Sequence, residues 1–301
     1  MTIASAPATH PLALPNPGVA LSAEAVAHRV RDLPALPAAL TEALAALRSE
    51  RLNTERLAQL LERDQALCGR TLRLANSAFY GLQGHVGTVH DALRLLGLRT
   101  VGSMMGAASL AGYAHVARCP GFDFNVYWRH SLAVSMAARE IAVACGHDGD
   151  QAAVAGLLHD VGQLAMVAYF PDAFAAALDL GRTADCEPLQ AERSVLGLDH
   201  AQVGGMVAQH WRLPPAMVQA IAAHHEPPAL APTGMATALT DVVHLADAMA
   251  HALDLAQDPQ ECVPNVSLDS WERLNAGRLD TAALFTTVEE GVAAMAASLN
   301  L

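Results

Sequence analysis

Residues 156–164 read GLLHDVGQL, an apolar run that a single His-Asp pair interrupts. His159 and Asp160 would cost free energy inside an apolar helix unless another group paired with them. A divalent metal would do so, because neutral imidazole and carboxylate both ligate Zn, Mn and Fe. Adjacent helical residues point about 100° apart, so both could still reach one ion between them. For this stretch alone, a polar pair that merely packs in the core remains the alternative.

Further histidines and one aspartate recur in the same way, each on or beside an apolar stretch of its own predicted helix. They are His130, His200, the consecutive His224 and His225, and Asp247. Any one of them alone is better explained as a core or surface side chain. Separate helices that each offer a His or Asp inward form the arrangement with which helical bundles build metal sites. We therefore expect these side chains and the His-Asp pair to converge, because unpaired buried polar groups each cost about 1–3 kcal/mol.

The composition predicts a helical protein with a sizeable core. Its 301 residues suit one large or two modest domains. Hydrophobic residues make up 52% and charged residues only 16%, whereas aromatic residues make up 4%. The core is therefore built from Ala, Leu and Val, and Ala and Leu are among the best helix formers. Since no β-branched run alternates with polar residues, we expect an all-α fold.

Charge and cysteine usage narrow the classes of partner and compartment. The formal net charge of −12 disfavours nonspecific nucleic-acid binding, which needs Lys and Arg against phosphates. It does not exclude a small anionic ligand held by metals, since a local ion can outweigh the global field. The five cysteines are scattered and show no CxxC spacing, which argues against a disulfide framework or a thiolate zinc site. A reducing cytoplasm fits this pattern.

Neither a secretory signal nor a membrane span is expected. The N-terminus lacks the basic start and apolar core of a signal peptide. The uncharged stretch from Thr100 to Ala117 is about long enough to span a bilayer. Because its Gly, Ser and Ala favour lipid only weakly, we interpret it as a buried core helix. These observations predict a cytoplasmic protein that contacts neither membrane nor nucleic acid.

Proline and glycine punctuation divides the chain into four predicted parts. Residues 1–22 are proline-rich and read as a disordered or loosely attached arm. A first helical lobe follows over 23–118, and Asn76 and Tyr80 within it are expected to serve architecture or partner contact. A second helical lobe, which carries the His and Asp residues, spans 119–255. Two weaker helices over 256–301 are expected to cover it.

Within the second lobe, three helix boundaries are predicted. Residues 151–164 are expected to form one continuous helix that carries the His-Asp pair. Asn125 is a candidate N-cap for the helix with His130, and Asp199 for the helix with His200. The helix that carries Asp247 is expected to begin near residue 241.

The chain resembles the HDOD family, the HD-related output domains of bacterial signalling. The matching pieces follow in order from about residue 27 to residue 250, which is most of the chain. They are LPALP (33–37), LANSAFY (74–80), WRHS (128–131), GLLHDVG (156–162), DH with VG (199–204), W with LP (211–214) and HH (224–225). The resemblance implies an all-helical, HD-like bundle in the second lobe. It also implies an output or interaction module whose catalytic residues are often eroded.

Similarity to the HD-GYP cyclic dinucleotide phosphodiesterases of the same superfamily implies a ligand set. Metal-ligand positions of those enzymes match His130, His159, Asp160, His200, His224, His225 and Asp247. Asp160 would bridge two ions, and one or two ions of Fe, Mn or Zn are expected. Asp160 and Gln163 would then be the candidate catalytic residues.

Three departures from those enzymes weaken the prediction of hydrolysis. Val126 occupies a position where a Glu ligand is common, and Gln163 stands where a Lys would supply a cation to the phosphate. Residues 227–229, Pro-Pro-Ala, replace the Gly-Tyr-Pro motif.

Three functions therefore stay open. The first is a signalling output module that binds a protein partner or a nucleotide, with or without a structural metal. The second is a metal-dependent phosphodiesterase that acts on a nucleotide or cyclic dinucleotide. The third is a purely structural partner-binding protein without a ligand. Metal content separates the first two from the third, and phosphodiester hydrolysis separates the second from the first.

Overall fold

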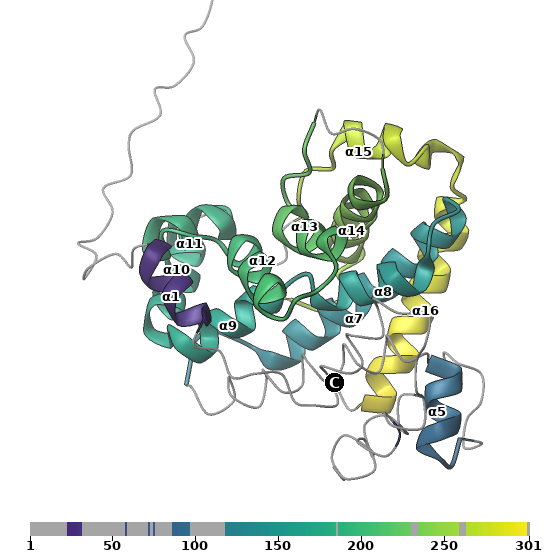
Figure 1. Ribbon diagram of the computed structural model, residues 1–301, viewed down its shortest axis with the longest axis horizontal. Coiled ribbons are helices and arrows are strands. Elements are labelled where there is room, and N and C mark those ends of the chain that lie inside the picture. Colours follow the sequence, from purple (N-terminus) through teal and green to yellow (C-terminus); the bar gives the residue numbers. More distant parts are fainter. Residues whose placement is uncertain are drawn as a thin grey trace, which may run out of the picture.

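The computed structural model shows helices and no strand in the residues that it describes, so the all-α prediction is confirmed for them (Figure 1). Those residues are 23–31, 58, 72, 75, 86–96, 118–184, 186–229, 234–258 and 263–299. The predicted arm, most of the predicted first lobe, Asn76, Tyr80 and the stretch 100–117 lie outside them. The division into two lobes therefore stays a prediction.

The helices follow one another with short connections. Their order is α1 (Ala23–Arg31), α5 (Val89–Leu96), α7 (Phe124–Ala144), α8 (Gly149–Leu158), α9 (Val161–Tyr169), α10 (Pro171–Ala184), α11 (Pro188–Leu196), α12 (His200–His210), α13 (Pro215–Ala223), α14 (Met235–Ala252), α15 (Leu268–Arg273), the 3-10 turn η2 (Ala276–Arg278) and α16 (Thr281–Leu299).

Helix α7 is the central strut of the bundle. It packs against α8, α14 and α16, and α16 runs alongside it in Figure 1. Helix α12 packs against α9, α13 and the N-terminal helix α1, while α13 joins this group to α14. Ala133, Ala137 and Ala138 of α7 are fully buried, so small side chains let neighbouring helices approach it. The expected core of Ala, Leu and Val is what the described residues contain.

The expected continuous helix over residues 151–164 is wrong, because the chain leaves the helix at the His-Asp pair. Helix α8 ends at Leu158 and α9 begins at Val161. Asp160 has φ −97° and ψ 15°, which departs from helical values. The break lets α9 lie against α12 so closely that a Cβ on Gly162 would stand 1.9 Å from the carbonyl oxygen of His200. Only glycine fits there.

Two other predicted boundaries shift and one is confirmed. Asp123, not Asn125, caps α7, and its carboxylate accepts a 2.8 Å hydrogen bond from the Asn125 backbone N–H. An aspartate side chain two residues earlier reaches the free N–H groups better than a residue already inside the helix. Helix α14 begins at Met235, before the expected residue 241. Asp199 caps α12 in a capping box with Gln202, as predicted.

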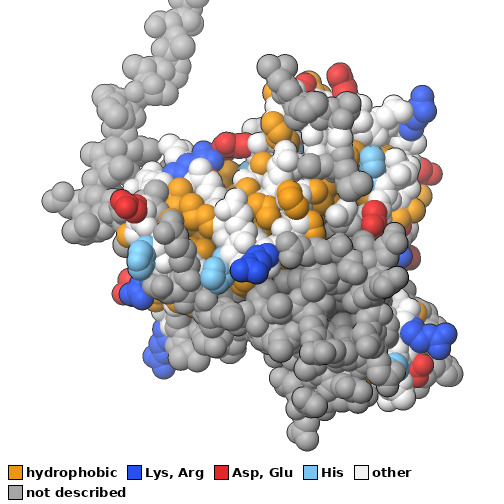
Figure 2. All heavy atoms as spheres, in the orientation of Figure 1, with side chains coloured by type: hydrophobic (Ala, Val, Ile, Leu, Met, Phe, Trp, Pro, Cys, Tyr) orange, Lys and Arg blue, Asp and Glu red, His pale blue; other side chains and the backbone are white. Residues whose placement is uncertain are grey.

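The surface offers no membrane-spanning element that its burial supports. Residues Gly149–Tyr169 are long and apolar enough to cross a bilayer, but 83% of that window is buried inside the protein, as in a core helix. On the face shown in Figure 2, acidic and basic side chains are scattered, with apolar side chains between them.

Candidate metal centre

Eight His and Asp side chains from five parts of the bundle meet at one place, which we call the His/Asp cluster. Helix α7 supplies His130, and the break between α8 and α9 supplies His159 and Asp160. The start of α12 supplies His200, and the residues after α13 supply His224 and His225. Helix α14 supplies Asp247 and His251. The structure thus brings together all seven side chains that the sequence singled out as ligands, and their role as ligands stays a prediction.

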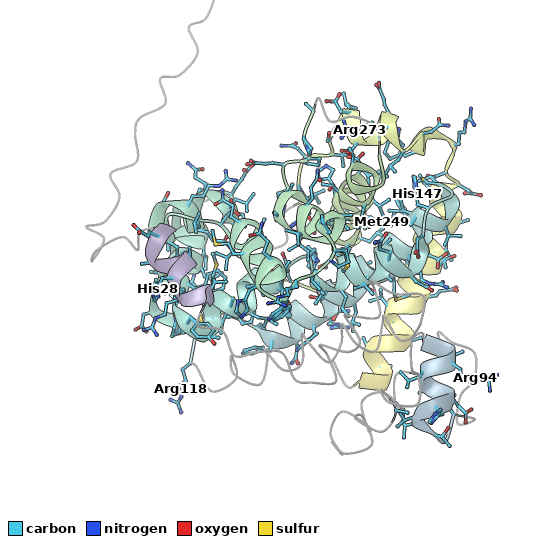
Figure 3. All side chains as sticks on the ribbon, viewed as in Figure 1. His28, Arg94, Arg118, His147, Met249 and Arg273 are labelled. Atoms are coloured by element: carbon cyan, nitrogen blue, oxygen red, sulfur yellow. The ribbon has the colours of Figure 1, made fainter. Side chains whose placement is uncertain are left out.

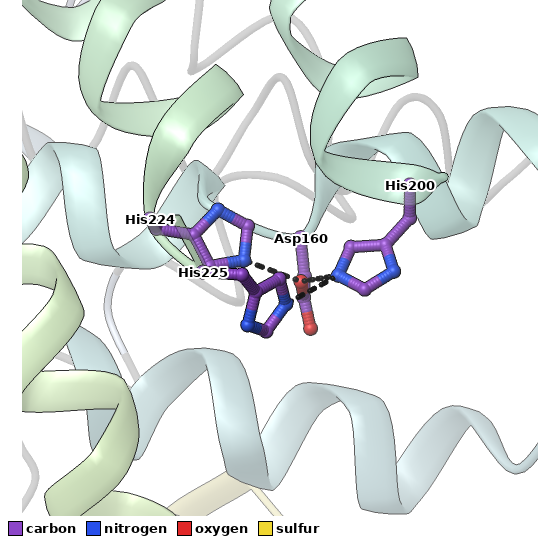
Figure 4. A group of neighbouring side chains, drawn as sticks. All are labelled: Asp160, His200, His224 and His225. Atoms are coloured by element: carbon purple, nitrogen blue, oxygen red, sulfur yellow. Dashed lines mark hydrogen bonds and ion pairs between the residues drawn. The ribbon is translucent and has the colours of Figure 1, made fainter. Parts of the chain in front are cut away.

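One half of the cluster is the four-residue group of Asp160, His200, His224 and His225 (Figure 4). One ligand atom from each of the four lies within 4.8 Å of the others. Asp160 Oδ1 lies 3.1 Å from His200 Nε2 and 3.6 Å from His224 Nε2. The Nε2 atoms of His200 and His225 are 2.9 Å apart.

The other half contains His130, His159, Asp247 and His251. His130 Nε2 lies 3.0 Å from Asp247 Oδ1 and 3.2 Å from His159 Nε2. His251 Nε2 lies 3.3 Å from the same Asp247 oxygen. Asp160 also belongs to this half, since its second oxygen, Oδ2, lies 3.4 Å from His159 Nε2. The two oxygens of one carboxylate therefore face the two halves.

Gln163 is directed at the cluster through Asp160. Its side-chain amide donates a 2.8 Å hydrogen bond to Asp160 Oδ2. A neutral amide thus stands where the resemblance leads us to expect a lysine, and it cannot supply that cation to a phosphate.

Backbone and side-chain acceptors fix which nitrogen of three histidines carries a proton. His159 Nδ1 lies 2.7 Å from the Gly156 carbonyl oxygen, and His224 Nδ1 lies 2.8 Å from that of Ile221. His200 Nδ1 lies 2.9 Å from the Glu192 carboxylate. Because these partners only accept, each Nδ1 donates, and in the neutral ring Nε2 then presents a lone pair. All three lone pairs face the interior of the cluster.

This arrangement calls for a cation. Asp160 Oδ1, Asp247 Oδ2 and His224 Nε2 are buried and have no hydrogen-bond partner. Buried polar atoms are normally satisfied, so several orphaned acceptors at one point indicate that a positive group belongs between them. Lone pairs of imidazoles and carboxylates, with no cysteine among them, fit Mn, Fe or Zn. The residues present therefore fit the expected divalent metal.

When protons are the only cations, the pKa values divide the cluster. Burial alone would raise the pKa of Asp160, but His159 and His200 hold it well below its usual range. Burial would lower the pKa of His200, but the carboxylates of Glu192 and Asp160 raise it well above its usual value. Burial, together with the nearby His159, lowers the pKa of His224 to about 4. The site thus holds charged carboxylates that protons or a metal must balance.

The cluster is nearly closed to solvent. His159 and His224 are 0% exposed and Asp247 is 1% exposed. The side chains of His225 and His251 retain 18% and 25% of their exposure, so solvent reaches the cluster from their side. A cavity of about 580 Å³ lies elsewhere, between α7, α8, α14 and α15, and is lined by residues such as His147, Asp241 and Arg273 (Figure 3). It contains none of the cluster side chains.

Sequence reasoning missed two residues at the cluster. His251 was not expected as a ligand, although its spacing of four residues from Asp247 on a helix signals a shared face. Glu192 was not singled out because it lies on α11, and only the fold brings it to His200.

Comparisons with known proteins were made against family models, curated proteins and solved structures. The model of the HDOD domain matches residues 33–227. An uncharacterized protein of Treponema pallidum (strain Nichols) is 26% identical over 211 residues, which cover 68% of this chain and 40% of that protein. The chain thus spans about two fifths of the length of this curated relative.

Among solved structures, an HDOD domain protein of unknown function from Geobacter sulfurreducens has a TM-score of 0.75 at 25% identity, covering 92% of this chain and 98% of that one. A protein of Shewanella amazonensis SB2B that is provisionally named a phosphohydrolase has a TM-score of 0.68 at 27% identity, covering 91% and 97%. A protein of Marinobacter aquaeolei VT8, provisionally named for signal transduction, has a TM-score of 0.70 at 21% identity, covering 90% and 60%. The last likeness concerns the fold alone.

Proposed function

Because the chain belongs to the HDOD family, we propose that it is a signal-transduction output module that acts by binding a protein partner or a small ligand. Its His/Asp cluster holds one or two divalent ions, of Mn, Fe or Zn. The partner is a signalling protein, and a nucleotide is the small ligand that metals in this cluster would favour. The protein acts in the cytoplasm and contacts neither membrane nor nucleic acid.

A single observation carries the metal-binding part. Imidazole lone pairs and two buried carboxylates face one another at Asp160 and Asp247, and Asp160 Oδ1 lacks a hydrogen-bond partner although His200 Nε2 is only 3.1 Å away. A metal would accept both atoms as ligands. Since the ligands come from several separate helices, its binding free energy would add to the stability of the bundle.

Two features favour an output module over turnover. Only His225 and His251 give the cluster appreciable contact with solvent, which leaves little access for a substrate. Gln163 occupies Asp160 Oδ2 with a neutral amide, so the phosphate-binding cation of the related enzymes is absent from this position. Both features are compatible with an ion that organises the fold for a partner.

The alternative is a metal-dependent phosphohydrolase that acts on a nucleotide or a cyclic dinucleotide. The position of Asp160 between the two halves favours it, because a bridging carboxylate is what a two-metal site requires. Two bound ions supply a water of lowered pKa and a clamp for phosphoryl oxygens. The similar Shewanella amazonensis protein carries a phosphohydrolase name.

Hydrolysis of bis(p-nitrophenyl) phosphate by the metal-loaded protein separates the two functions. The full chain is incubated with Mn²⁺, Fe²⁺ or Zn²⁺ and compared with Asp160→Asn treated in the same way. We expect equal background rates from both proteins. A metal-dependent rate that Asp160→Asn loses would instead establish the phosphohydrolase.

A further inference from the structure

Helix α11 lies beside the His/Asp cluster and reaches it through a buried acid. Glu192 is 3% exposed. Its two carboxylate oxygens each lie 2.9 Å from His200 Nδ1, and Oε2 also accepts a 2.7 Å hydrogen bond from the His200 backbone N–H. Among the described residues, the side-chain hydrogen bonds of Glu192 all go to His200.

We propose that Glu192 is a positioning residue for metal binding, which fixes the ring of His200 so that Nε2 points at Asp160 as a ligand. This inference rests on the proposed binding of metal at the cluster. The hydrogen bond at Nδ1 selects the tautomer, and the bond at the backbone anchors the acid to the first residue of α12. Acceptors placed behind a ligating histidine in this way tune its affinity for metal.

The chemistry requires a carboxylate at this position. Two donors, the ring Nδ1–H and the backbone N–H of His200, converge on one side chain, and a carboxylate offers an acceptor oxygen to each. A glutamine offers only one oxygen and would turn its NH₂ group against a second donor. An aspartate is one methylene shorter and would fall short of one of the two donors.

A purely structural role would leave the burial of this charge unexplained. An isolated buried carboxylate is costly, and the nearest basic residue on α11 is used elsewhere. Arg193 Nε donates to Asp199 Oδ2 at 2.7 Å, and its NH2 group donates to Glu226 Oε1 at 2.8 Å. The positive charge that balances Glu192 is therefore His200 itself, as a protonated ring or as the ligand of a cation.

Arg193 adds a second, weaker hold on the four-residue group. Asp199 directly precedes His200, and Glu226 directly follows His225, so one guanidinium joins both ligand-bearing segments to α11. Arg193 and Glu226 are largely exposed, with side-chain exposures of 42% and 67%, and such ion pairs contribute little. We therefore assign the main role to Glu192.

The test is the affinity of the full chain for Mn²⁺, measured by calorimetry in Glu192→Gln and in a control variant. Removing a hydrogen-bond partner behind a ligand weakens metal binding by about 10- to 100-fold, and we expect a loss in that range. The control is Glu187→Gln, which removes the same charge from the exposed N-cap of the same helix, where the side chain makes no capping bond. We expect its affinity to equal that of the unmodified protein.

A spectroscopic measurement distinguishes positioning from general loss of stability. The visible absorption of bound Co²⁺ reports its ligand geometry, and it should change in Glu192→Gln but not in Glu187→Gln. If Glu192→Gln does not fold, Glu192→Asp keeps the charge and should still show weaker Mn²⁺ binding and an altered Co²⁺ spectrum. Unchanged affinity and spectrum in a folded variant would overturn the role of Glu192 alone. If the unmodified protein bound neither ion, both this role and the metal-binding proposal would fail.

Discussion

Helix α14 carries two buried aspartates whose surroundings differ. Asp241 is 0% exposed, and Arg273 donates to both of its oxygens at 2.6 and 2.8 Å while Ser270 donates to one at 2.7 Å. Figure 3 labels this Arg273 on α15. Asp247 is 1% exposed, but its neighbours within ion-pair distance are imidazoles, and its Oδ2 has no hydrogen-bond partner.

This difference separates a structural acid from a site. The charge of Asp241 is balanced within the protein, so the pair simply fastens α15 to α14. The charges of Asp247 and Asp160 are balanced only if protons or a metal join the cluster. Burial alone therefore says little about function, whereas unsatisfied acceptors that face lone pairs say much.

The largest expected effect comes from breaking the satisfied pair. Asp241→Asn leaves the guanidinium of Arg273 without its counter-charge. Breaking a buried ion pair costs about 3–5 kcal/mol, and we expect about 3 kcal/mol because the Arg273 side chain keeps 14% of its exposure. Urea unfolding measures the loss, and metal content should not change. Asp269→Asn, an exposed change on the same helix, is the control. A drop in bound metal would contradict the separation of the two regions.

The next effect concerns the contact that holds α9 on α12. A Cβ on Gly162 would meet the His200 carbonyl oxygen at 1.9 Å and the Gly204 nitrogen at 2.7 Å, so Gly162→Ala must push the helices apart. Overpacking of this kind costs about 1–3 kcal/mol, and it should also weaken Mn²⁺ binding because His200 moves away from Asp160. Calorimetry and urea unfolding measure both.

Gly181→Ala is the matched control, since a Cβ there meets its first neighbour at an ordinary 3.7 Å. In helix α10 this change should stabilise slightly, because alanine is the better helix former. Equal behaviour of the two variants would refute the close approach of α9 to α12.

The two regions should also differ in their response to pH. Raised pKa values keep His200 and His159 protonated when no metal is present. Metal must displace these protons, so affinity for Mn²⁺ should rise with pH until the raised pKa values are passed, by about tenfold per pH unit for each proton released. The pKa of His224, lowered to about 4, makes it neutral already at pH 7, so it contributes no proton there. Calorimetry at pH 6, 7 and 8 checks this, and a constant affinity would contradict it.

The smallest effect is expected from Gln163→Lys. The change removes the amide that bonds to Asp160 Oδ2 and places a cation where a phosphate could meet it. We expect a faint, severalfold rise in bis(p-nitrophenyl) phosphate hydrolysis by metal-loaded protein. Gln190→Lys on the exposed face of α11 adds the same charge away from the cluster and should give no rise. Equal rates in both variants would show that the missing cation is not what limits hydrolysis.

The sequence was sufficient for the fold class and for the proximity of the His and Asp residues. Helical spacing with Pro and Gly punctuation predicts the helices, and Asp199 with Gln202 carries its cap signal locally. His-Asp in an apolar run is also a local signal, because such a pair needs a partner wherever it folds.

Other features depend on contacts that no local pattern carries. The break at His159–Asp160 follows from the packing of α9 on α12, and periodicity alone continues the helix through it. The contact of Glu192 with His200 depends on how the α11–α12 connection turns at Gly197, whose φ of 76° is left-handed. His251 could have been found, because it follows Asp247 by one helical turn.

The metal content of the purified full chain tests the central claim most directly. Elemental analysis after loading with Mn²⁺, Fe²⁺ or Zn²⁺ and removal of free ion should find one or two equivalents per chain. Asp160→Asn should lose the most, because its oxygens face both halves of the cluster. Background levels of every metal in the folded, unmodified protein would contradict the account and leave the cluster as a network of protonated histidines and carboxylates.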